Sequence, residues 1–473
     1  MLGRTRRIHF VGIGGIGMSG IAELLANQGY AVSGSDAKAS DVTRRLETLG
    51  VRVVTGHAAE HVGDADVVVV SSAVRPTNPE VVAARARAIP VIPRAEMLAE
   101  LMRLKQGIAI AGAHGKTTTT SMVALLLDRA GLDPTAVIGG RLSAFGSNAR
   151  LGQGSYLVAE ADESDGSFLA LSPVISIITN VDREHLDHYG SYEAVLDAFV
   201  AFANKVPFYG VVIACADDAA LAALRPRITR RVVTYGIHTA TADIRADEVA
   251  LEAFGSSCRV SAGGRALGPL RLSVPGRHNL LNALSAVAVG LELGLTFERI
   301  AAALVEFRGA ERRFQALGEM DGILVVDDYG HHPTEIAAVI AAARAGLERR
   351  LVVVFQPHRY TRTERLLAEF GEVLARADVV VLCDIYAAGE DPIPGITVYA
   401  VADAVRKAGG DQPAIVSAIE EAPAAVAALA EPGDLVITLG AGSIGTVGSK
   451  ILAALATRSG PRARPDAGRE GGR

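Results

Sequence analysis

Short apolar runs alternate with segments of helical periodicity along most of the chain. Consecutive apolar residues predict buried strands, and apolar residues at every third or fourth position predict helices. The predicted strands cover residues 7–11, 30–34, 51–54, 66–70, 89–92, 108–111, 156–159, 174–179, 322–326, 351–355, 378–382 and 434–439. Helices are predicted between many of them, as at 19–27 and 95–103. This alternation predicts an α/β fold with mostly parallel sheets.

Length, composition and charge narrow the class of protein. The 473 residues predict about two to four domains, and 49% hydrophobic with 21% charged residues is typical of a globular protein. A formal net charge of −5 argues against nucleic-acid binding. The three cysteines are isolated, and no apolar stretch is long enough to span a membrane. Glycines interrupt the apolar start of the chain, unlike a signal peptide, so we expect a cytoplasmic protein without membrane insertion.

The stretch IAIAGAHGKTTTTS, residues 108–121, has the pattern of a phosphate-binding loop. A predicted strand leads through a glycine-rich turn into a helix, so backbone N–H groups face an anion. Lys116 is placed to reach the β- and γ-phosphates, and the Thr117 hydroxyl to hold Mg²⁺. The first glycine stands one position late, at Gly112 rather than Ala111. The predicted nucleotide contacts here are Gly112, Ala113, His114, Gly115, Lys116, Thr117 and Thr118.

A second glycine-rich turn follows the first predicted strand. Gly12, Gly14 and Gly17 form a GxGxxG pattern between a strand and a helix, and Asp36 follows about twenty residues later. This is the dinucleotide fingerprint. A diphosphate of any nucleotide fits such a loop, however, and Asp36 can bond a ribose of UDP as well as one of NAD. The pattern alone leaves both ligands open.

Carboxylates and a histidine follow two predicted strands of the same region. Glu160 lies nearest the strand end in the acidic run EADESD and is the predicted Mg²⁺ ligand, with an acidic surface turn as the alternative. His185 is predicted to contact metal or phosphate. His188 follows three positions later, but the lack of a nearby cysteine argues against structural zinc.

Polar residues later in the chain suit a nucleotide and an anion. Asn279 and Asn282 share a helix face and suit a base edge, although Asn279 can equally cap the helix. Arg313 could stabilise the negative charge on a transferring phosphoryl group. The alternative is that it belongs to a solvated basic turn. The strands at 322–326 and 351–355 lead into DDYGHHP and QPHRYTRT, a cationic cluster that suits a carboxylate or a developing anion.

Taken in order, these motifs resemble those of the Mur ligases. The resemblance covers nearly the whole chain and rests on HFVGIGGIGMSGIAELL, AGAHGKTTTT, EADESDGSF, TNVDREHLDHY, GRHNLLNALSA, ERRF, DDYGHHPTE and FQPHRYTRT. It accounts for the late glycine, because these ligases carry GxHGKT. It implies a Rossmann-like UDP-sugar-binding domain at 1–105, a central P-loop ATP-binding domain at 106–311, a C-terminal Rossmann-like amino-acid-binding domain at 312–457 and a disordered tail at 458–473.

The resemblance implies an ATP-dependent amide-forming ligase of peptidoglycan precursor synthesis. The segments are closest to members that join L-alanine to the carboxylate of UDP-N-acetylmuramate through an acyl phosphate. The implied substrates are UDP-N-acetylmuramate, L-alanine and ATP, with Mg²⁺ or Mn²⁺ as the metal, and the pattern is compatible with a homodimer. Sister ligases carry a carbamylated lysine after the His185 position, whereas no lysine stands between 183 and 204 here. That absence fits alanine-adding members and leaves the second metal's ligands unassigned.

The resemblance also implies a role for each matching residue. The implied catalytic residues are Lys116, His185, Arg313, His331, Arg359 and Arg362. ATP would be bound by the loop residues above together with His278, Asn279, Asn282, Arg313 and Asp328. The UDP-sugar would be bound by Gly12, Gly14, Gly15, Ile16, Gly17, Asp36, Ser71 and Ser72. The amino acid would be bound by Tyr329, His331, His358, Arg359 and Arg362. The metal would be bound by Thr117, Glu160 and His185.

Three other functions are compatible with parts of this sequence. A recycling ligase that attaches a whole tripeptide to the same UDP-sugar shares the phosphate-binding loop. An NAD-dependent oxidoreductase would use the first glycine-rich turn, but it would leave Lys116 and the cationic strand ends without a role. A non-catalytic ATP-driven switch is the third alternative.

Overall fold

The computed structural model describes residues 3–71, 73–142 and 147–458. Ser72 and the tail from residue 459, both named in the predictions, lie outside this range. The chain forms two compact units that meet in sequence between Glu311 and Arg312. In the described residues, no helix is long and apolar enough to cross a membrane.

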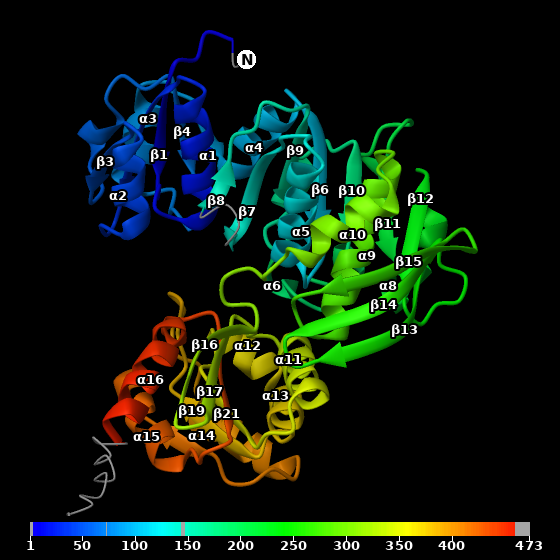
Figure 1. The fold of residues 1–473 in the computed structure, drawn as a ribbon. Helices are drawn as coiled ribbons and strands as arrows, with labels where there is room; N and C mark the ends of the chain where they lie inside the picture. The colour runs from blue at the N-terminus through cyan, green and yellow to red at the C-terminus, as the bar shows by residue number, and fades with distance from the viewer. Residues whose placement is uncertain (1–2, 72, 143–146, 459–473) are drawn as a thin grey trace, which may run out of the picture. The chain divides into compact units, whose positions relative to one another are not determined.

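The first unit begins with a five-stranded parallel sheet of order β3-β2-β1-β4-β5 (Figure 1). Its elements are β1 (Arg7–Val11), α1 (Ile16–Asn27), β2 (Ala31–Asp36), α2 (Asp41–Thr48), β3 (Arg52–Thr55), η1 (Ala59–Val62), β4 (Val67–Val70), α3 (Pro79–Ala86), β5 (Val91–Pro93) and α4 (Arg94–Met102). The strand order reverses at β1, between β2 and β4. Ligands of open α/β sheets bind at such switch points, beyond the strands' carboxyl ends.

The same unit continues into a ten-stranded sheet of order β15-β14-β13-β12-β11-β10-β6-β9-β7-β8. Its elements are β6 (Gln106–Ala111), α5 (Lys116–Arg129), β7 (Thr135–Leu142), β8 (Ser147–Arg150), β9 (Tyr156–Glu160), η2 (Ser167–Ala170), β10 (Ile175–Ile178), α6 (Leu186–Tyr189), α7 (Tyr192–Asn204), β11 (Val211–Cys215), α8 (Ala219–Leu224), η3 (Arg225–Arg227), β12 (Val232–Gly236), β13 (Ile244–Glu252), β14 (Gly255–Ala262), β15 (Arg265–Leu272), α9 (Arg277–Glu292) and α10 (Phe297–Val305). β6 lies between β10 and β9 and is parallel to both.

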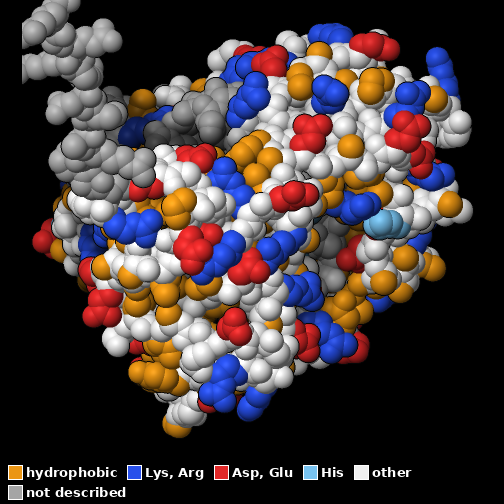
Figure 2. All heavy atoms as spheres, turned by 60° about the horizontal axis from the view of Figure 1, so that its bottom comes forward, with side chains coloured by type: hydrophobic (Ala, Val, Ile, Leu, Met, Phe, Trp, Pro, Cys, Tyr) orange, Lys and Arg blue, Asp and Glu red, His pale blue; other side chains and the backbone are white. Residues whose placement is uncertain are grey.

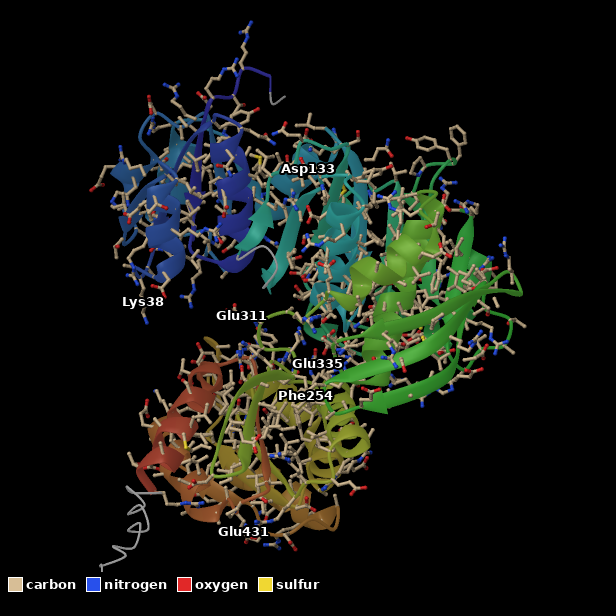
Figure 3. The ribbon with its side chains drawn as sticks, in the orientation of Figure 1. Lys38, Asp133, Phe254, Glu311, Glu335 and Glu431 are labelled. Carbon is tan, nitrogen blue, oxygen red and sulfur yellow. The ribbon has the colours of Figure 1, made fainter. Side chains whose placement is uncertain are left out.

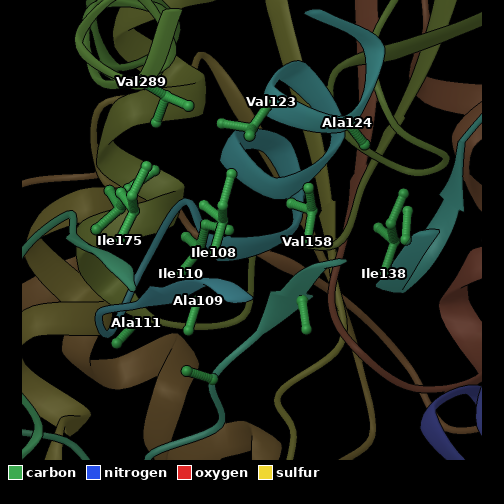
Figure 4. Packing of buried hydrophobic residues seen from close by; sticks show 14 of the residues in the cluster. Ile108, Ala109, Ile110, Ala111, Val123, Ala124, Ile138, Val158, Ile175 and Val289 are labelled. Carbon is green, nitrogen blue, oxygen red and sulfur yellow. The ribbon is translucent and has the colours of Figure 1, made fainter. Parts of the chain in front are cut away.

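One hydrophobic core runs through the first unit. Ile108, Ile110 and Val158 on the sheet are fully buried together with Val123 of α5 and Val289 of α9 (Figure 4). The same cluster includes apolar residues of the first sheet, and α1 packs against β7 and β8. The two sheets of this unit therefore share a continuous apolar interior, which fixes the glycine-rich turn before α1 next to the central sheet.

The second unit is built on a six-stranded sheet of order β16-β17-β21-β18-β19-β20, with only β16 antiparallel to its neighbour. Its elements are β16 (Gln315–Met320), β17 (Ile323–Asp328), α11 (Pro333–Gly346), β18 (Leu351–Phe355), α12 (Tyr360–Arg365), α13 (Leu367–Leu374), β19 (Val379–Cys383), α14 (Val398–Lys407), β20 (Ala414–Val416), η4 (Ile419–Glu421), α15 (Ala422–Leu429), β21 (Leu435–Leu439), η5 (Ser443–Thr446) and α16 (Val447–Arg458). Separate apolar clusters cover the two faces of this sheet, as its unbroken valine-rich strands require.

The surface carries charges of both signs. On the face drawn in Figure 2, lysine and arginine side chains are interspersed with aspartate and glutamate. This distribution agrees with the small formal net charge of −5.

Candidate active site

The phosphate-binding loop joins β6 to α5 and contains a position that only glycine fits. Gly112 has a φ of 135°, and a Cβ atom there would lie 2.0 Å from Thr179 Oγ1 and 3.1 Å from the backbone nitrogen of Asn180. Any side chain would therefore collide with the segment that follows β10. The late glycine of the sequence pattern is required by this close packing.

The segment after β10 also fixes the loop by hydrogen bonds. His114 N donates to Asn180 Oδ1 at 2.9 Å, while His114 O accepts from Asn180 Nδ2 at 2.9 Å and from Thr179 Oγ1 at 2.6 Å. The His114 ring lies 2.9 Å from Asp182 Oδ2. These contacts hold the loop backbone in a single arrangement.

Gly115 brings the loop against α9. Its φ of 82° is left-handed, and a Cβ there would lie 2.7 Å from Asn282 Oδ1, so one predicted base-edge residue touches the loop. Asn279 is buried and donates to Pro275 O at 2.7 Å, while Asn282 Nδ2 donates to Asn279 Oδ1 at 3.4 Å. The residue preceding α9 is Gly276, and no side chain caps this fully described helix, which argues against the capping alternative for Asn279. His278 is the second residue of α9.

Lys116 is the first residue of α5, and its ammonium is held in place by neighbouring acceptors. Its Nζ donates to Gly112 O at 2.6 Å and to Glu163 Oε1 at 2.7 Å. The Glu163 side chain is only 3% exposed and that of Lys116 17%. Burial disfavours the charged ammonium, but the carboxylates of Glu163 and Asp162 outweigh this effect and raise the pKa of Lys116. The lysine is therefore a fixed positive charge at the loop.

Glu163 also belongs to a group of side chains suited to a divalent cation. One ligand atom from each of Glu163, Glu184 and His185 lies within 4.8 Å of the others. Glu163 Oε2 is buried and has no hydrogen-bond partner among the described residues. A buried carboxylate oxygen without a donor is costly unless a cation or a water satisfies it. The donor set therefore fits a hard, oxygen-preferring cation.

His185 occupies a strained position in this group. It precedes α6 with a φ of 58°, an uncommon conformation for a residue other than glycine. Its Nε2 lies 3.3 Å from Glu184 Oε2 and 3.6 Å from Glu163 Oε1. Burial alone would lower the pKa of His185. Hydrogen bonds with Glu163 and Glu184 outweigh the effect of burial, so the pKa is raised to about 9.

The other predicted metal ligands lie in the same region. Glu160 ends β9, and its carboxylate accepts from Gly139 N at 2.7 Å. Thr117 is the second residue of α5 and directly follows Lys116, and Thr118 is buried. Of the two carboxylates, it is Glu163 that contacts Lys116 and His185. Sequence reasoning did not single it out.

The N-terminal glycine-rich turn is closed by Asp36 and by the end of β2. Gly12 N donates to Ser35 O at 2.8 Å, and Gly14 N donates to Asp36 Oδ2 at 2.8 Å. Gly12 has a φ of 79°, and a Cβ on Gly14 would lie 2.9 Å from Asp36 Oδ2. Asp36 thus braces the turn and does not stand apart from it.

A cavity of about 290 Å³ opens between this turn and the central sheet. It lies within the first unit, and one side is formed by Gly15 and Gly17 with Ser71 after β4. The cavity is also lined by Glu160, the last residue of β9, and by Asp162. Ile16 lies in the turn as the first residue of α1. Three of the predicted UDP-sugar residues, Gly15, Gly17 and Ser71, therefore line one cavity with the predicted metal ligand Glu160.

In the second unit, aromatic rings follow one another across three strand ends. Ring centroids are 5.4 Å apart for Tyr329 and His331, 5.8 Å for His331 and His358, and 5.5 Å for His358 and Tyr386. Glu335 of α11, labelled in Figure 3, accepts from His331 N at 3.0 Å. The predicted amino-acid residues are therefore neighbours within this unit.

Two arginines adjoin this row of rings. Arg362 Nη1 lies 3.2 Å from His358 Nδ1, and Arg359 N donates to Tyr386 O at 2.8 Å. Burial, together with the nearby charges of His331, Arg362 and Arg359, lowers the pKa of His358 to about 3. Arginine can only donate, so Nδ1 of the neutral ring accepts and Nε2 carries the proton. His358 thus offers an N–H donor beside guanidinium groups.

The paired arginines at the start of the second unit have different surroundings. Arg312 Nε donates to Asp327 Oδ2 at 2.7 Å and its Nη2 to Gly440 O at 2.7 Å, so it braces two strand ends. Both arginines lie over the Tyr329 ring, with the Cζ atom 5.1 Å from the centroid for Arg312 and 5.4 Å for Arg313, whereas Arg313 Nη1 lies 3.5 Å from Glu335 Oε1. Asp328 accepts from two backbone N–H groups, and its burial raises its pKa to about 6 despite the nearby Arg313.

Sequence reasoning missed several residues of these sites. They are Arg94, Asp162, Glu163, Asn180, Asp182, Glu184, Glu335, Tyr386 and Glu390. Asp162, Glu163, Asp182 and Glu184 stand inside motifs that were recognised, so position after a strand end could have flagged them. Arg94 and Tyr386 carry no such signal, because long-range folding alone brings them to the sites.

The sequence of this chain is similar to those of known proteins. Three family models match consecutive parts of the chain: "Mur ligase family, catalytic domain" at 7–106, "Mur ligase middle domain" at 110–290 and "Mur ligase, glutamate ligase domain" at 312–442. A UDP-N-acetylmuramate–L-alanine ligase of Geobacter sp. (strain M21) is 56% identical over 453 residues, which are 96% of this chain and 98% of the relative. The chain belongs to the Mur ligase family. The predicted family is thereby confirmed.

Solved structures of the family agree with the fold. The UDP-N-acetylmuramate-alanine ligase of Thermotoga maritima matches with a TM-score of 0.82 and 30% identity, over 96% of this chain and 99% of the other. A murein peptide ligase of Psychrobacter arcticus 273-4 matches with a TM-score of 0.70 and 25% identity, over 95% and 98%. The predicted three-domain α/β architecture is confirmed, and the family favours the ligase prediction over an oxidoreductase.

Proposed function

We propose that this Mur ligase joins L-alanine to the carboxylate of UDP-N-acetylmuramate with cleavage of ATP. The arrangement of Lys116, Glu163 and His185 supports this proposal most, because a fixed cation and a carboxylate with an unsatisfied oxygen suit a metal-bound nucleoside triphosphate. The names of relatives at 54–56% identity support L-alanine as the acceptor.

The reaction divides into two transfers. The sugar carboxylate attacks the γ-phosphorus of ATP, which gives an acyl phosphate and ADP. The amine of L-alanine then attacks the acyl carbon, phosphate leaves with the bonding electrons, and the nitrogen loses a proton. Activation is necessary because a carboxylate is a poor electrophile and its oxygen a poor leaving group at neutral pH.

In the first unit, the chain's own residues bind and orient the phosphates. Backbone N–H groups of Gly115 and Lys116, at the start of α5, would cradle them, and Lys116 would exchange Glu163 for a phosphate oxygen. Glu163, Glu184 and His185 would hold a divalent cation, with Thr117 and Glu160 as further predicted ligands. We propose Mg²⁺, which when bound neutralises charge on the β- and γ-phosphates.

In the second unit, the row of rings and its arginines bind the amino acid. Arg359 and Arg362 suit its carboxylate, and Nε2–H of His358 offers a further donor. His331 and Tyr329 complete the predicted set, and Arg313 with Asp328 stays assigned to the nucleotide. The domain limits at 105, 311 and 457 remain as predicted. Cytoplasmic location and a homodimer also stay predictions.

The decisive experiment is phosphate release from ATP and Mg²⁺ with UDP-N-acetylmuramate and a series of acceptors. We expect release with L-alanine, and little release with the tripeptide L-alanyl-γ-D-glutamyl-meso-diaminopimelate. A preference for the tripeptide would assign the chain to the recycling ligases. Release that needs no acceptor at all would point to an ATP-driven switch.

A further inference from the structure

Arg94 stands where two cavities of the first unit meet. It is the first residue of α4, and it lines both the 290 Å³ cavity at the glycine-rich turn and a second cavity of about 250 Å³. The second cavity is also lined by Arg75 and Arg85, and Ser71 borders both. A ligand that extends through either cavity would meet the Arg94 guanidinium.

The guanidinium lies directly on the glycine-rich turn. A Cβ atom on Gly17 would lie 2.5 Å from Arg94 Nη1 and 3.1 Å from its Cζ, so the absence of a side chain at Gly17 makes room for this arginine. The start of helix α1 and a guanidinium thus lie at the same cavity, a combination that suits an anion.

In the structure, Arg94 is paired with a carboxylate at long distance. Its Nη2 lies 3.4 Å from Asp162 Oδ2, and the two side chains are 25% and 41% exposed. Long, partly exposed ion pairs contribute little to stability. Arg94 is therefore able to leave Asp162 for an anion that accepts shorter, bidentate hydrogen bonds.

Asp162 connects this arginine with the phosphate-binding loop. The Asp162 carboxylate pairs with Arg94 Nη2 at 3.4 Å, accepts from Ser164 N at 3.1 Å and contributes negative charge at Lys116. The carboxylate thus serves two cations, one at each nucleotide-binding turn. When Arg94 leaves, the negative charge of Asp162 remains near Lys116.

We propose that Arg94 binds an anionic group of the nucleotide sugar and exchanges Asp162 for it. The proposal rests on the proposed function, which supplies two such groups, the diphosphate and the muramyl carboxylate. Arg94 is then a substrate-binding residue, and Asp162 positions it in the free enzyme. The exchange links occupation of the sugar-nucleotide cavity to the charge around Lys116.

Calorimetric binding titrations on the full chain without ATP test this proposal. We expect Arg94→Ala to weaken UDP-N-acetylmuramate binding between about tenfold and a hundredfold, and Arg94→Lys to weaken it less. Arg103→Ala is the matched control, since Arg103 follows the same helix and pairs only loosely with Glu100 at 3.4 Å. UDP-N-acetylglucosamine, which lacks the carboxylate, separates the two groups. Equal losses for both ligands assign Arg94 to the diphosphate, and a loss for the muramate alone assigns it to the carboxylate.

Asp162→Asn separates binding from a structural role. If Arg94 exchanges partners, this variant keeps or increases affinity for the sugar nucleotide, because the competing carboxylate is gone. A loss equal to that of Arg94→Ala would mean that the pair merely supports the fold, and would overturn the proposal. Binding that Arg94→Ala leaves unchanged would overturn it as well. If the unaltered protein failed to bind UDP-N-acetylmuramate, the proposed function itself would fail.

Discussion

Replacing Glu163 or Glu160 by glutamine distinguishes two carboxylates that stand three positions apart. Glu163→Gln removes the negative partner of Lys116, at 2.7 Å in a pair whose side chains are 3% and 17% exposed. Removing one partner of a buried pair costs about 3–5 kcal/mol. In this variant Lys116 keeps its hydrogen bonds to Gly112 O and Ala113 O and stays near the charge of Asp162. We therefore expect the free energy of unfolding to fall by about 3 kcal/mol.

Glu160→Gln should lower the free energy of unfolding less than Glu163→Gln does. Its amide oxygen can still accept from Gly139 N, a bond of 2.7 Å in the structure, so we expect a cost of about 1 kcal/mol. In scanning calorimetry without nucleotide or metal, the transition of the first unit should fall by about 5 °C for Glu163→Gln and by about 1–2 °C for Glu160→Gln. Added ADP identifies that transition by raising its temperature.

The same two variants test the metal site. Glu163→Gln should raise the Mg²⁺ concentration needed for half-maximal ATP turnover, because its unpartnered oxygen is lost from the group with Glu184 and His185. A larger effect of Glu160→Gln, on both the calorimetric transition and the Mg²⁺ requirement, would refute this reasoning. It would restore the assignment made from the sequence.

Three further predictions concern the loop and the second unit. Lys116→Ala should lower ATP turnover at least about a hundredfold while UDP-N-acetylmuramate still binds, and near-normal turnover at saturating Mg²⁺ would exclude its proposed role. Gly112→Ala should cost about 2 kcal/mol or more in stability or ATP binding, because its Cβ meets Thr179 Oγ1 at 2.0 Å; an unchanged melting curve and ATP affinity would contradict the packing. His358 should show no NMR titration midpoint above pH 5, because its pKa is lowered to about 3. Since the unfolded chain binds the proton first, the contribution of His358 to stability should be complete above the ordinary histidine pKa of 6.5 and be lost as the pH falls toward 3; a midpoint near 6.5 would contradict this.

The strands were predictable where burial on both faces leaves a continuous apolar run. Residues 351–355 were predicted as a strand, and β18 has the same limits with every residue buried. The antiparallel hairpins β13–β15 were missed because their exposed and buried positions alternate irregularly, and polar side chains interrupt the pattern. Sequence periodicity reports burial, so it fails where a strand is half exposed and bulged.

The candidate site was predictable as a set of motifs but not as a set of contacts. Spacing placed the acidic run at a strand end, but it did not indicate which carboxylate of the run faces Lys116. Glu163 reaches Lys116, and Glu160 turns to Gly139. Similarly, Asp36 matched a ribose-binding pattern but hydrogen-bonds the turn itself. Local sequence specifies residue types, whereas side-chain direction depends on backbone turns.

Gly112 packs closely against Thr179 and Asn180. The phosphate-binding loop and the segment after β10 therefore form one sequence motif, although they are far apart in the chain. The glycine position in the loop is constrained by the residues that follow a neighbouring strand. A loop of this kind transplanted into another P-loop protein should therefore fail unless the Thr-Asn pair moves with it. A sequence search that requires both segments should separate related nucleotide sites from unrelated ones better than the loop alone. If the glycine moves to another position during evolution, the residue at the position of Thr179 should change to one with a smaller side chain.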